Sequence, residues 1–273
     1  MGSFNNLLAN AIKQKNSNVC IGLDIDLKKI PVKDPLDFNK KIITSTFEIA
    51  CAYKPNLAFY EALGIPGLKL LLSTIQFIRD IDPEMIIIGD CKRGDIGPSA
   101  EAYSEAMFGY WNFDAITVNP WGGLETMIPY TLDASKGVFI WAKGSNPGSK
   151  DIQDLVTNQT QKRIYHEVAT MAESLNKNEN VGLVVGSNFP SEMKDLRDMC
   201  PAMPFLIPGI GAQGGDLESS VSPSLISNSP FLINSSRGII YSSNGQDFSK
   251  AANLAALKLR DDINQVKKDL TQT

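Results

Sequence analysis

Histidine is almost absent from this chain, since His166 is the only one among 273 residues. A Ser-His-Asp or Cys-His nucleophile system could be built only around that residue, and zinc sites with several histidines are excluded. His166 falls inside a segment with helical spacing and away from every predicted strand end. We therefore expect it to be a structural or surface residue.

Cysteine is also scarce, and no C-x-x-C pair occurs. The four cysteines lie far apart, at Cys20, Cys51, Cys91 and Cys200. Their number and spacing predict reduced, mostly buried thiols of an intracellular protein, not a disulfide framework or a metal cluster.

Long apolar runs and excess positive charge are missing as well. No run reaches the roughly 18–20 residues that a membrane-spanning helix needs. The first residues lack the basic-then-apolar order of a signal peptide, and Asn6 stands where a myristoylation signal has Ser or Thr. We expect a cytoplasmic protein. The net charge of −4 argues against broad binding of nucleic acid or anionic membranes as its main function.

Short apolar runs alternate with segments of helical spacing along the whole chain. Many of the runs are apolar throughout instead of alternating, as expected for parallel strands covered on both faces. The predicted strands are 19–24, 51–55, 85–90, 115–119, 137–142, 181–186, 204–208 and 231–235. The predicted helices are 35–50, 66–80, 98–109, 124–132, 151–175, 191–199, 214–222 and 246–266.

Eight strand–helix pairs in about 250 residues predict an α/β fold of the (β/α)8 TIM-barrel type. The alternative is a doubly wound open sheet, which would usually carry G-x-G-x-x-G after its first strand, where this chain reads Gly22-Leu23-Asp24-Ile25-Asp26. No linker or low-complexity stretch interrupts the pattern. We expect residues 1–273 to form a single barrel domain in which residues 1–18 are a short extra helix closing its lower end.

Charged residues stand at several predicted strand ends, where the active site of a barrel lies. Asp24 ends the first strand, Lys54 lies in the second, and the third runs into Asp90, Lys92 and Asp95. Asp90 and Lys92 are two positions apart, so in an extended chain they share a face. Asp95 need not point the same way and could reach a site from another direction or from a second subunit. A lysine flanked by carboxylates is held in its charged form and acts as a proton donor.

A phosphate site is predicted after the seventh and eighth strands, where barrels commonly hold phosphate. The glycine-rich segment 208–215 lets backbone N–H groups approach an anion, and Gln213 and Arg237 add side-chain donors. The stretch from 209 to about 230 is suited to closing over a ligand. Trp121 is expected to pack as barrel wall, and Lys143 could face either the site or solvent.

Six motifs in order along the chain resemble orotidine 5′-phosphate decarboxylases of the longer-chain branch. They are Gly22-Leu23-Asp24, Tyr53-Lys54-Pro55-Asn56, Asp90-Cys91-Lys92-Arg93-Gly94-Asp95-Ile96-Gly97, Ser145-Asn146-Pro147-Gly148, Pro208-Gly209-Ile210-Gly211-Ala212-Gln213-Gly214-Gly215 and Arg237-Gly238-Ile239. The resemblance covers essentially the whole chain and implies decarboxylation of orotidine 5′-monophosphate to UMP, without a metal ion or organic cofactor.

The resemblance also implies a role for each matching residue. Lys92 would protonate C6 of the pyrimidine as carbon dioxide leaves, and Asp90 would crowd the departing carboxylate. The partner subunit of a homodimer would lend Asp95 and Ile96, which makes each site composite. The residues implied for substrate binding are Asp24 and Lys54 on the ribose hydroxyls, Ser145 and Pro208 at the base, Gln213 and Arg237 on the phosphate, and Ser99.

Some positions depart from the family pattern. Gly144 and Ser99 stand where relatives often have threonine, Ser236 stands where a glycine often precedes the arginine, and residues 187–190 also differ. Two other functions remain open. One is a metal-dependent phosphosugar-barrel lyase or aldol synthase that shares the Asp-x-Lys-x-x-Asp element, and the other is a non-catalytic nucleotide-binding barrel.

Overall fold

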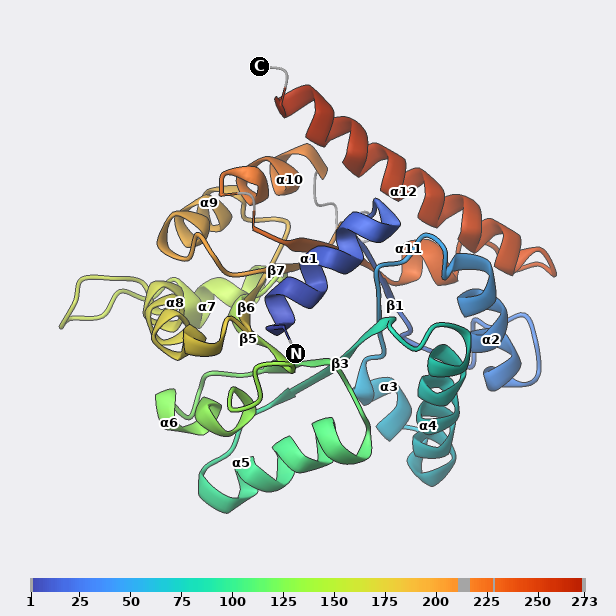
Figure 1. The fold of residues 1–273 in the computed structure, drawn as a ribbon, viewed down its shortest axis with the longest axis horizontal. Helices are drawn as coiled ribbons and strands as arrows, with labels where there is room; N and C mark the ends of the chain where they lie inside the picture. The colour runs from blue at the N-terminus through green and yellow to red at the C-terminus, as the bar shows by residue number, and fades with distance from the viewer. Residues whose placement is uncertain (1, 211–216, 228, 272–273) are drawn as a thin grey trace.

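Eight parallel strands close into a barrel in which each strand pairs with its neighbour in the chain and β8 returns to β1 (Figure 1). The computed structural model describes residues 2–210, 217–227 and 229–271. The predicted barrel is confirmed, and the doubly wound sheet is not formed. The strands are β1 (Val19–Gly22), β2 (Ala52–Lys54), β3 (Ile86–Arg93), β4 (Ala115–Val118), β5 (Gly137–Lys143), β6 (Val181–Val185), β7 (Phe205–Pro208) and β8 (Phe231–Ser235).

Alternate strand residues pack on opposite faces of the barrel wall, which explains why the strands are apolar throughout. Those that face inward form a compact cluster that includes Cys20, Ile88, Phe139 and Leu232. The intervening residues join a larger cluster with the apolar faces of the surrounding helices. The barrel is therefore filled below its carboxyl-terminal rim, and ligands can enter only from that end.

Most helices lie where the sequence places them, between consecutive strands. Two short helices that follow β2 and β8 directly, α3 and α11, were not predicted. The helices are α1 (Phe4–Lys15), α2 (Pro35–Thr46), α3 (Leu57–Glu61), α4 (Gly64–Ile81), α5 (Gly97–Ser104), α6 (Leu124–Met127), α7 (Lys150–Gln153), α8 (Ile164–Leu175), α9 (Pro190–Met199), α10 (Leu217–Leu225), α11 (Arg237–Ile240) and α12 (Phe248–Thr271).

The single helix predicted over 151–175 is wrong. The chain forms α7, then a hairpin that projects from the barrel, then α8 (Figure 1). In the hairpin the Thr157 N–H donates to the Lys162 carbonyl at 2.8 Å. Gln161 has a φ of 57°, a left-handed conformation that no helix tolerates. By contrast, α10 lies close to the helix predicted over 214–222, within the stretch 209–230 that we expected to close over a ligand.

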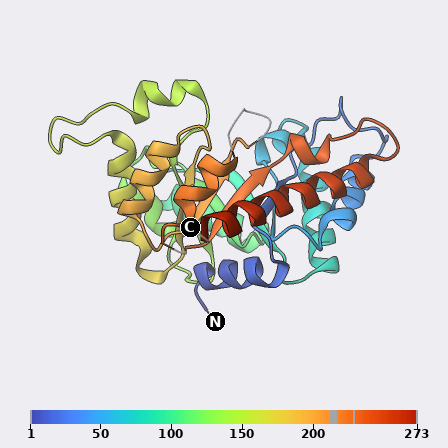
Figure 2. The same cartoon turned by 90° about the horizontal axis from the view of Figure 1, so that it is seen from above.

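The first helix closes the lower end of the barrel, as predicted. It crosses the end opposite to the carboxyl termini of the strands (Figure 2). Phe4 and Leu8 are buried among the inward-facing strand residues, and the Phe4 ring meets Phe139 edge-on with centroids 6.0 Å apart. A Cβ at Gly137 would lie 2.4 Å from the Phe4 ring, so glycine is needed there for the helix to dock.

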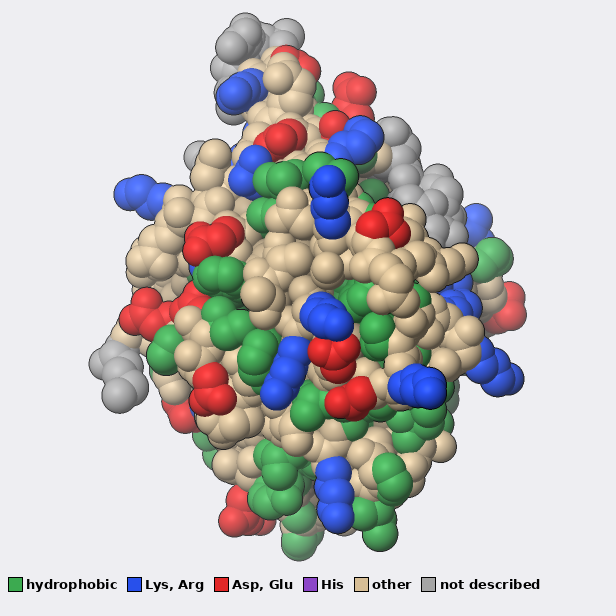
Figure 3. All heavy atoms as spheres, turned by 90° about the vertical axis from the view of Figure 1, so that its right-hand side faces the viewer, with side chains coloured by type: hydrophobic (Ala, Val, Ile, Leu, Met, Phe, Trp, Pro, Cys, Tyr) green, Lys and Arg blue, Asp and Glu red, His purple; other side chains and the backbone are tan. Residues whose placement is uncertain are grey.

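Two further expectations concern thiols and membranes. All four cysteines are free, and Cys20, Cys51 and Cys200 are buried. Within the described ranges, no helix combines the length and the apolar character that crossing a bilayer requires. On the face that carries α2 and α4, acidic and basic side chains are interspersed and form no basic stripe (Figure 3).

Candidate active site

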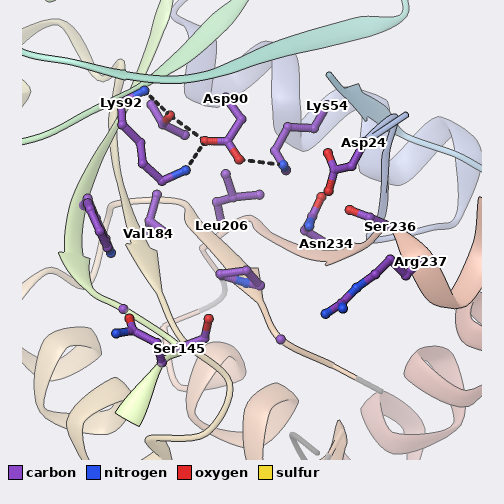
Figure 4. Close-up of a pocket in the computed structure, with 16 residues that line it drawn as sticks. Asp24, Lys54, Asp90, Lys92, Ser145, Val184, Leu206, Asn234, Ser236 and Arg237 are labelled. Carbon is purple, nitrogen blue, oxygen red and sulfur yellow. Dashed lines mark hydrogen bonds and ion pairs between the residues drawn. The ribbon is translucent and has the colours of Figure 1, made fainter. Parts of the chain in front are cut away.

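A cavity of about 210 Å³ opens at the carboxyl-terminal ends of the strands. Its lining comes from all eight strands or the turns that follow them (Figure 4). Seven of the residues predicted for the site line it together: Asp24, Lys54, Asp90, Lys92, Ser145, Pro208 and Arg237.

Three charged side chains form a connected row on one wall of this cavity. The Asp90 carboxylate accepts a hydrogen bond from Lys54 Nζ at 2.8 Å on one oxygen and from Lys92 Nζ at 2.5 Å on the other. The side chain of Lys54 is 5% exposed, whereas that of Lys92 is 38% exposed. Both ammonium groups line the cavity, and that of Lys92 is the more accessible one.

The backbone at Lys92 is not extended, contrary to our expectation. Lys92 has a φ of 44°, a left-handed backbone conformation that is rare for residues other than glycine. Gly89 pairs with Ile116 but Arg93 pairs with Val118, so β3 carries extra residues here. The bulge turns the ammonium back onto Asp90, which gives the predicted convergence by another route.

Thr117 and Asn119, on and after β4, fix this unusual backbone. The Lys92 N–H donates to Thr117 Oγ1 at 3.0 Å, and Asn119 Nδ2 donates to the Lys92 carbonyl at 3.0 Å. Thr117 Oγ1 also donates to Asp90 at 2.9 Å. Strain at Lys92 is therefore balanced by hydrogen bonds that aim its side chain into the cavity.

Mutual attraction keeps the buried pair ionised. Burial by itself would raise the pKa of Asp90, but the charges of Lys54 and Lys92 outweigh it and hold that pKa well below its ordinary value. Burial would likewise lower the pKa of Lys54, and the carboxylates of Asp90 and Asp24 outweigh it and raise that pKa. Both groups stay charged across the physiological range.

Asp24 stands beside this row, just after β1. Its Oδ1 is buried and accepts no hydrogen bond from the described residues, and the neighbouring Asn234 Oδ1 is in the same condition. Figure 4 shows the two side chains facing each other next to Lys54. Such oxygens are suited to receive hydroxyl donors. Within the described residues, no group of three or more His, Cys, Asp and Glu side chains is arranged to hold a metal ion.

Arg237 lies at the opposite side of the cavity from Lys92 (Figure 4). It begins α11, directly after Ser236. The Ser236 side chain packs over Gly22, where a Cβ would lie only 1.8 Å from its hydroxyl oxygen. Gly209 lines the cavity with a φ of 108°, which glycine adopts without strain. Gln213 lies outside the described residues.

Three predicted site residues do not line the cavity of this chain. Asp95 and Ile96 precede α5 and Ser99 lies in its first turn, and all three are exposed. The Ile96 side chain is 62% exposed, and Asp95 Oδ1 accepts a hydrogen bond from the Ile96 N–H at 2.8 Å. Within one chain these residues therefore take no part in the cavity that Lys92 lines.

Sequence reasoning missed Thr117, Asn119, Trp141 and Asn234. Thr117 and Asn234 are polar residues inside otherwise apolar strands, and that signal could have identified them. Trp141 offered no such signal, because an apolar residue in a buried strand is ordinary. Its ring lines the cavity, with Lys92 Nζ 5.8 Å from the ring centroid.

Three further residues can now be placed. Lys143 faces neither the site nor solvent, because it is fully buried and paired with Asp154. Trp121 is 80% exposed, so its prediction as barrel wall is wrong. His166 lies on α8 outside the cavity, with Nε2 3.7 Å from Asp195, in agreement with a structural or surface residue.

Comparison with known proteins gives one consistent result. The family model for "Orotidine 5'-phosphate decarboxylase / HUMPS family" matches residues 17–252. Orotidine 5'-phosphate decarboxylase of Thermomicrobium roseum is 41% identical, with 98% of this chain and 97% of the relative covered, and that of Dehalococcoides mccartyi is 44% identical, with 96% and 97% covered. The structure of Leishmania donovani OMP decarboxylase superposes with a TM-score of 0.83 at 35% identity, with 97% of this chain and 98% of that chain covered. The chain belongs to the orotidine 5'-phosphate decarboxylase / HUMPS family.

Proposed function

We propose that this chain is a carboxy-lyase that converts orotidine 5′-monophosphate to UMP and carbon dioxide, a step of pyrimidine biosynthesis. The observation that carries the proposal is the placement of Lys92 and Arg237 on opposite sides of one cavity. A nucleotide held by its phosphate at Arg237 presents its base to the ammonium that Asp90 orients. Membership of the family and the relatives of 41% and 44% identity support this activity.

Lys92 supplies the central chemical step. The bond between C6 and the carboxyl carbon breaks, its electron pair stays on C6, and carbon dioxide leaves. A proton from Lys92 Nζ then goes to C6, and the neutral amine regains a proton from solvent. Such a carbanion has no ordinary electron sink, so the site must supply on the order of 20 kcal/mol of transition-state stabilisation. A fixed ammonium beside the developing charge provides a large part of it. Asp90 adds a smaller contribution by crowding the departing carboxylate.

The remaining cavity residues bind the rest of the nucleotide. The Asp24 carboxylate accepts hydrogen bonds from the ribose hydroxyls and the Lys54 ammonium donates to them. Ser145 and Pro208 contact the base. Arg237 binds the phosphate by paired charge-assisted hydrogen bonds, and Gln213 donates a further hydrogen bond to it. Binding energy gained at the phosphate, far from the reacting carbon, holds the base against the charged row.

We infer further that the molecule is a single-domain cytoplasmic homodimer with composite sites. Asp95, Ile96 and Ser99 would enter the cavity of the partner subunit. Their exposure supports this assignment, since it leaves the three side chains free to contact a second subunit. Four free thiols fit a reducing compartment.

Absorbance of orotidine 5′-monophosphate tests the function directly. We expect the absorbance to fall on mixing with the protein, and the rate to be unchanged when EDTA is present. A rate that collapses in EDTA and returns with magnesium would favour the metal-dependent lyase. No change of absorbance together with tight UMP binding would favour the non-catalytic nucleotide-binding barrel.

Lys92→Ala separates chemistry from binding. We expect turnover to be abolished because the proton donor is gone, while affinity for UMP stays within about 10-fold because Arg237 still holds the phosphate. Calorimetry with UMP and the absorbance assay measure the two effects. Near-normal turnover of the variant would contradict the role of Lys92.

A further inference from the structure

A second lysine, Lys143 at the end of β5, is buried without being part of the cavity. Its side chain is fully buried, and its ammonium pairs with the Asp154 carboxylate. The same ammonium lies 4.6 Å from the centroid of the Phe189 ring and 5.5 Å from that of Tyr165. Tyr165 belongs to α8, so the ammonium is enclosed between the barrel wall and its outer layer, whereas the Asp154 side chain is 21% exposed. Burying the Lys143 charge is costly, and the pairing with Asp154 offsets part of that cost.

The pair closes the segment that carries Ser145. Asp154 directly follows α7, so its bond to Lys143 ties the end of the segment 144–153 back to the strand from which the segment departs. Next to it, the Gly144 N–H donates to Gln153 Oε1 at 2.9 Å. Gln153 and Asp154, at the end of α7, thus bind Gly144 and Lys143, at the end of β5.

The backbone of Ser145 is enclosed from the other side as well. The Gly186 N–H donates to the Lys143 carbonyl at 2.9 Å, and Asn188 Nδ2 donates to the Ser145 carbonyl at 3.0 Å. A Cβ at Gly186 would lie 2.6 Å from the Ser145 Cα. The position of Ser145 in the cavity is therefore set by its neighbours in space.

We infer that Lys143 and Asp154 are positioning residues for recognition of the base, acting through the backbone of Ser145. The inference rests on the proposed function, in which Ser145 contacts the pyrimidine. Neither residue lines the cavity, and both act by fixing where the Ser145 segment leaves β5. Loss of the pair should therefore weaken contacts to the base and leave contacts to the ribose and phosphate intact.

Two ligands that differ only in the base test this assignment. In Lys143→Met we expect affinity for UMP to fall about 10-fold, the value of one aligned hydrogen bond, and affinity for ribose 5-phosphate to change less than about 2-fold. The KM for orotidine 5′-monophosphate should rise with the loss of UMP affinity. Lys143→Arg keeps the charge and should restore both values. Asp154→Asn and Gln153→Ala repeat the test if Lys143→Met does not fold.

Lys15→Met is the matched control, because it breaks another lysine–aspartate pair, Lys15 with Asp82 at 3.0 Å, on a helix at the opposite end of the barrel. It should lower the melting temperature without changing the ratio of the two affinities. Equal losses for both ligands in the Lys143 and Asp154 variants, or no loss, would overturn the inference. A wild-type protein that neither binds UMP nor consumes orotidine 5′-monophosphate would instead overturn the proposed function.

Discussion

Asp90 carries more hydrogen bonds than any other carboxylate of the candidate site. It accepts from Lys54 on one oxygen and from Lys92 and Thr117 on the other. A carboxylate bound in this way cannot turn, so the two ammonium groups are held at fixed places on the wall of the cavity. The row is then prepared before any ligand arrives, which is what electrostatic catalysis requires.

Asp90→Asn should destabilise the protein in a pH-dependent manner. At pH 7 the variant leaves Lys54 buried without its main partner, and we expect a loss of about 3 kcal/mol in the free energy of unfolding. The pKa of Asp90 is depressed in the folded protein, so its contribution is complete above the unfolded value of about 3.9 and declines below it. Urea unfolding at pH 7 and pH 3.5 measures both values.

The difference between wild type and Asp90→Asn should thus be smaller at pH 3.5 than at pH 7. Asp37→Asn serves as the control, because Asp37 forms an exposed pair with Lys41 at 2.8 Å. Exposed pairs contribute about 0.5 kcal/mol or less, so this variant should unfold nearly as wild type does. A pH-independent difference for Asp90→Asn would contradict the linkage.

The charged residues at the predicted strand ends identified much of the cavity lining. They could not predict the backbone conformation that orients those side chains. Asp24, Lys54, Asp90, Lys92 and Arg237 all line it. The left-handed backbone at Lys92 depends on hydrogen bonds from β4, a strand more than 20 residues away in sequence. The residue pattern of β3 alone contains no information about hydrogen-bond partners on β4.

At the scale of elements, length decides what the sequence reveals. Long helices such as α4 and α12 repeat their apolar spacing over several turns, so their existence was predictable. α3 and α11 have about one turn each, and their spacing carries no period. The break between α7 and α8 could have been found, because residues 157–163 contain no apolar residue and therefore interrupt the helical spacing.

The closing helix α1 allows stability to be separated from activity. Phe4 is 1% exposed within the lower end of the barrel. We expect Phe4→Ala to lower the free energy of unfolding by about 3–4 kcal/mol through loss of buried area and the cavity that remains. The kcat and KM at 25 °C should be unchanged, since the site lies at the other end. Urea unfolding and the absorbance assay provide the two measurements.

Leu7→Ala is the control for that experiment, because Leu7 lies on the same helix but is 44% exposed. It should cost no more than about 0.5 kcal/mol. A large change of kcat in Phe4→Ala, with the protein still folded, would show that the two ends of the barrel are coupled.

At the scale of the whole molecule, the exposed segment at the start of α5 is the feature that one chain does not explain. Asp95 and Ile96 follow the charged row by only a few residues, yet they are exposed and do not line the cavity of their own chain. The sequence indicated this ambiguity, because Gly94 separates Asp95 from the strand. The proposed two-fold dimer would account for it, since each chain would then receive the segment that it also donates.

Mixing two inactive variants tests the composite site. Lys92→Ala and Asp95→Ala should each lack turnover as homodimers. In their heterodimer one site combines Lys92 of one chain with Asp95 of the other, so an equimolar, fully exchanged mixture should recover about a quarter of the wild-type sites. Lys92→Ala mixed with the double variant Lys92→Ala, Asp95→Ala forms no intact site and should recover nothing. If the first mixture is as inactive as the second, Asp95 acts within its own chain or not at all, and the composite site is wrong.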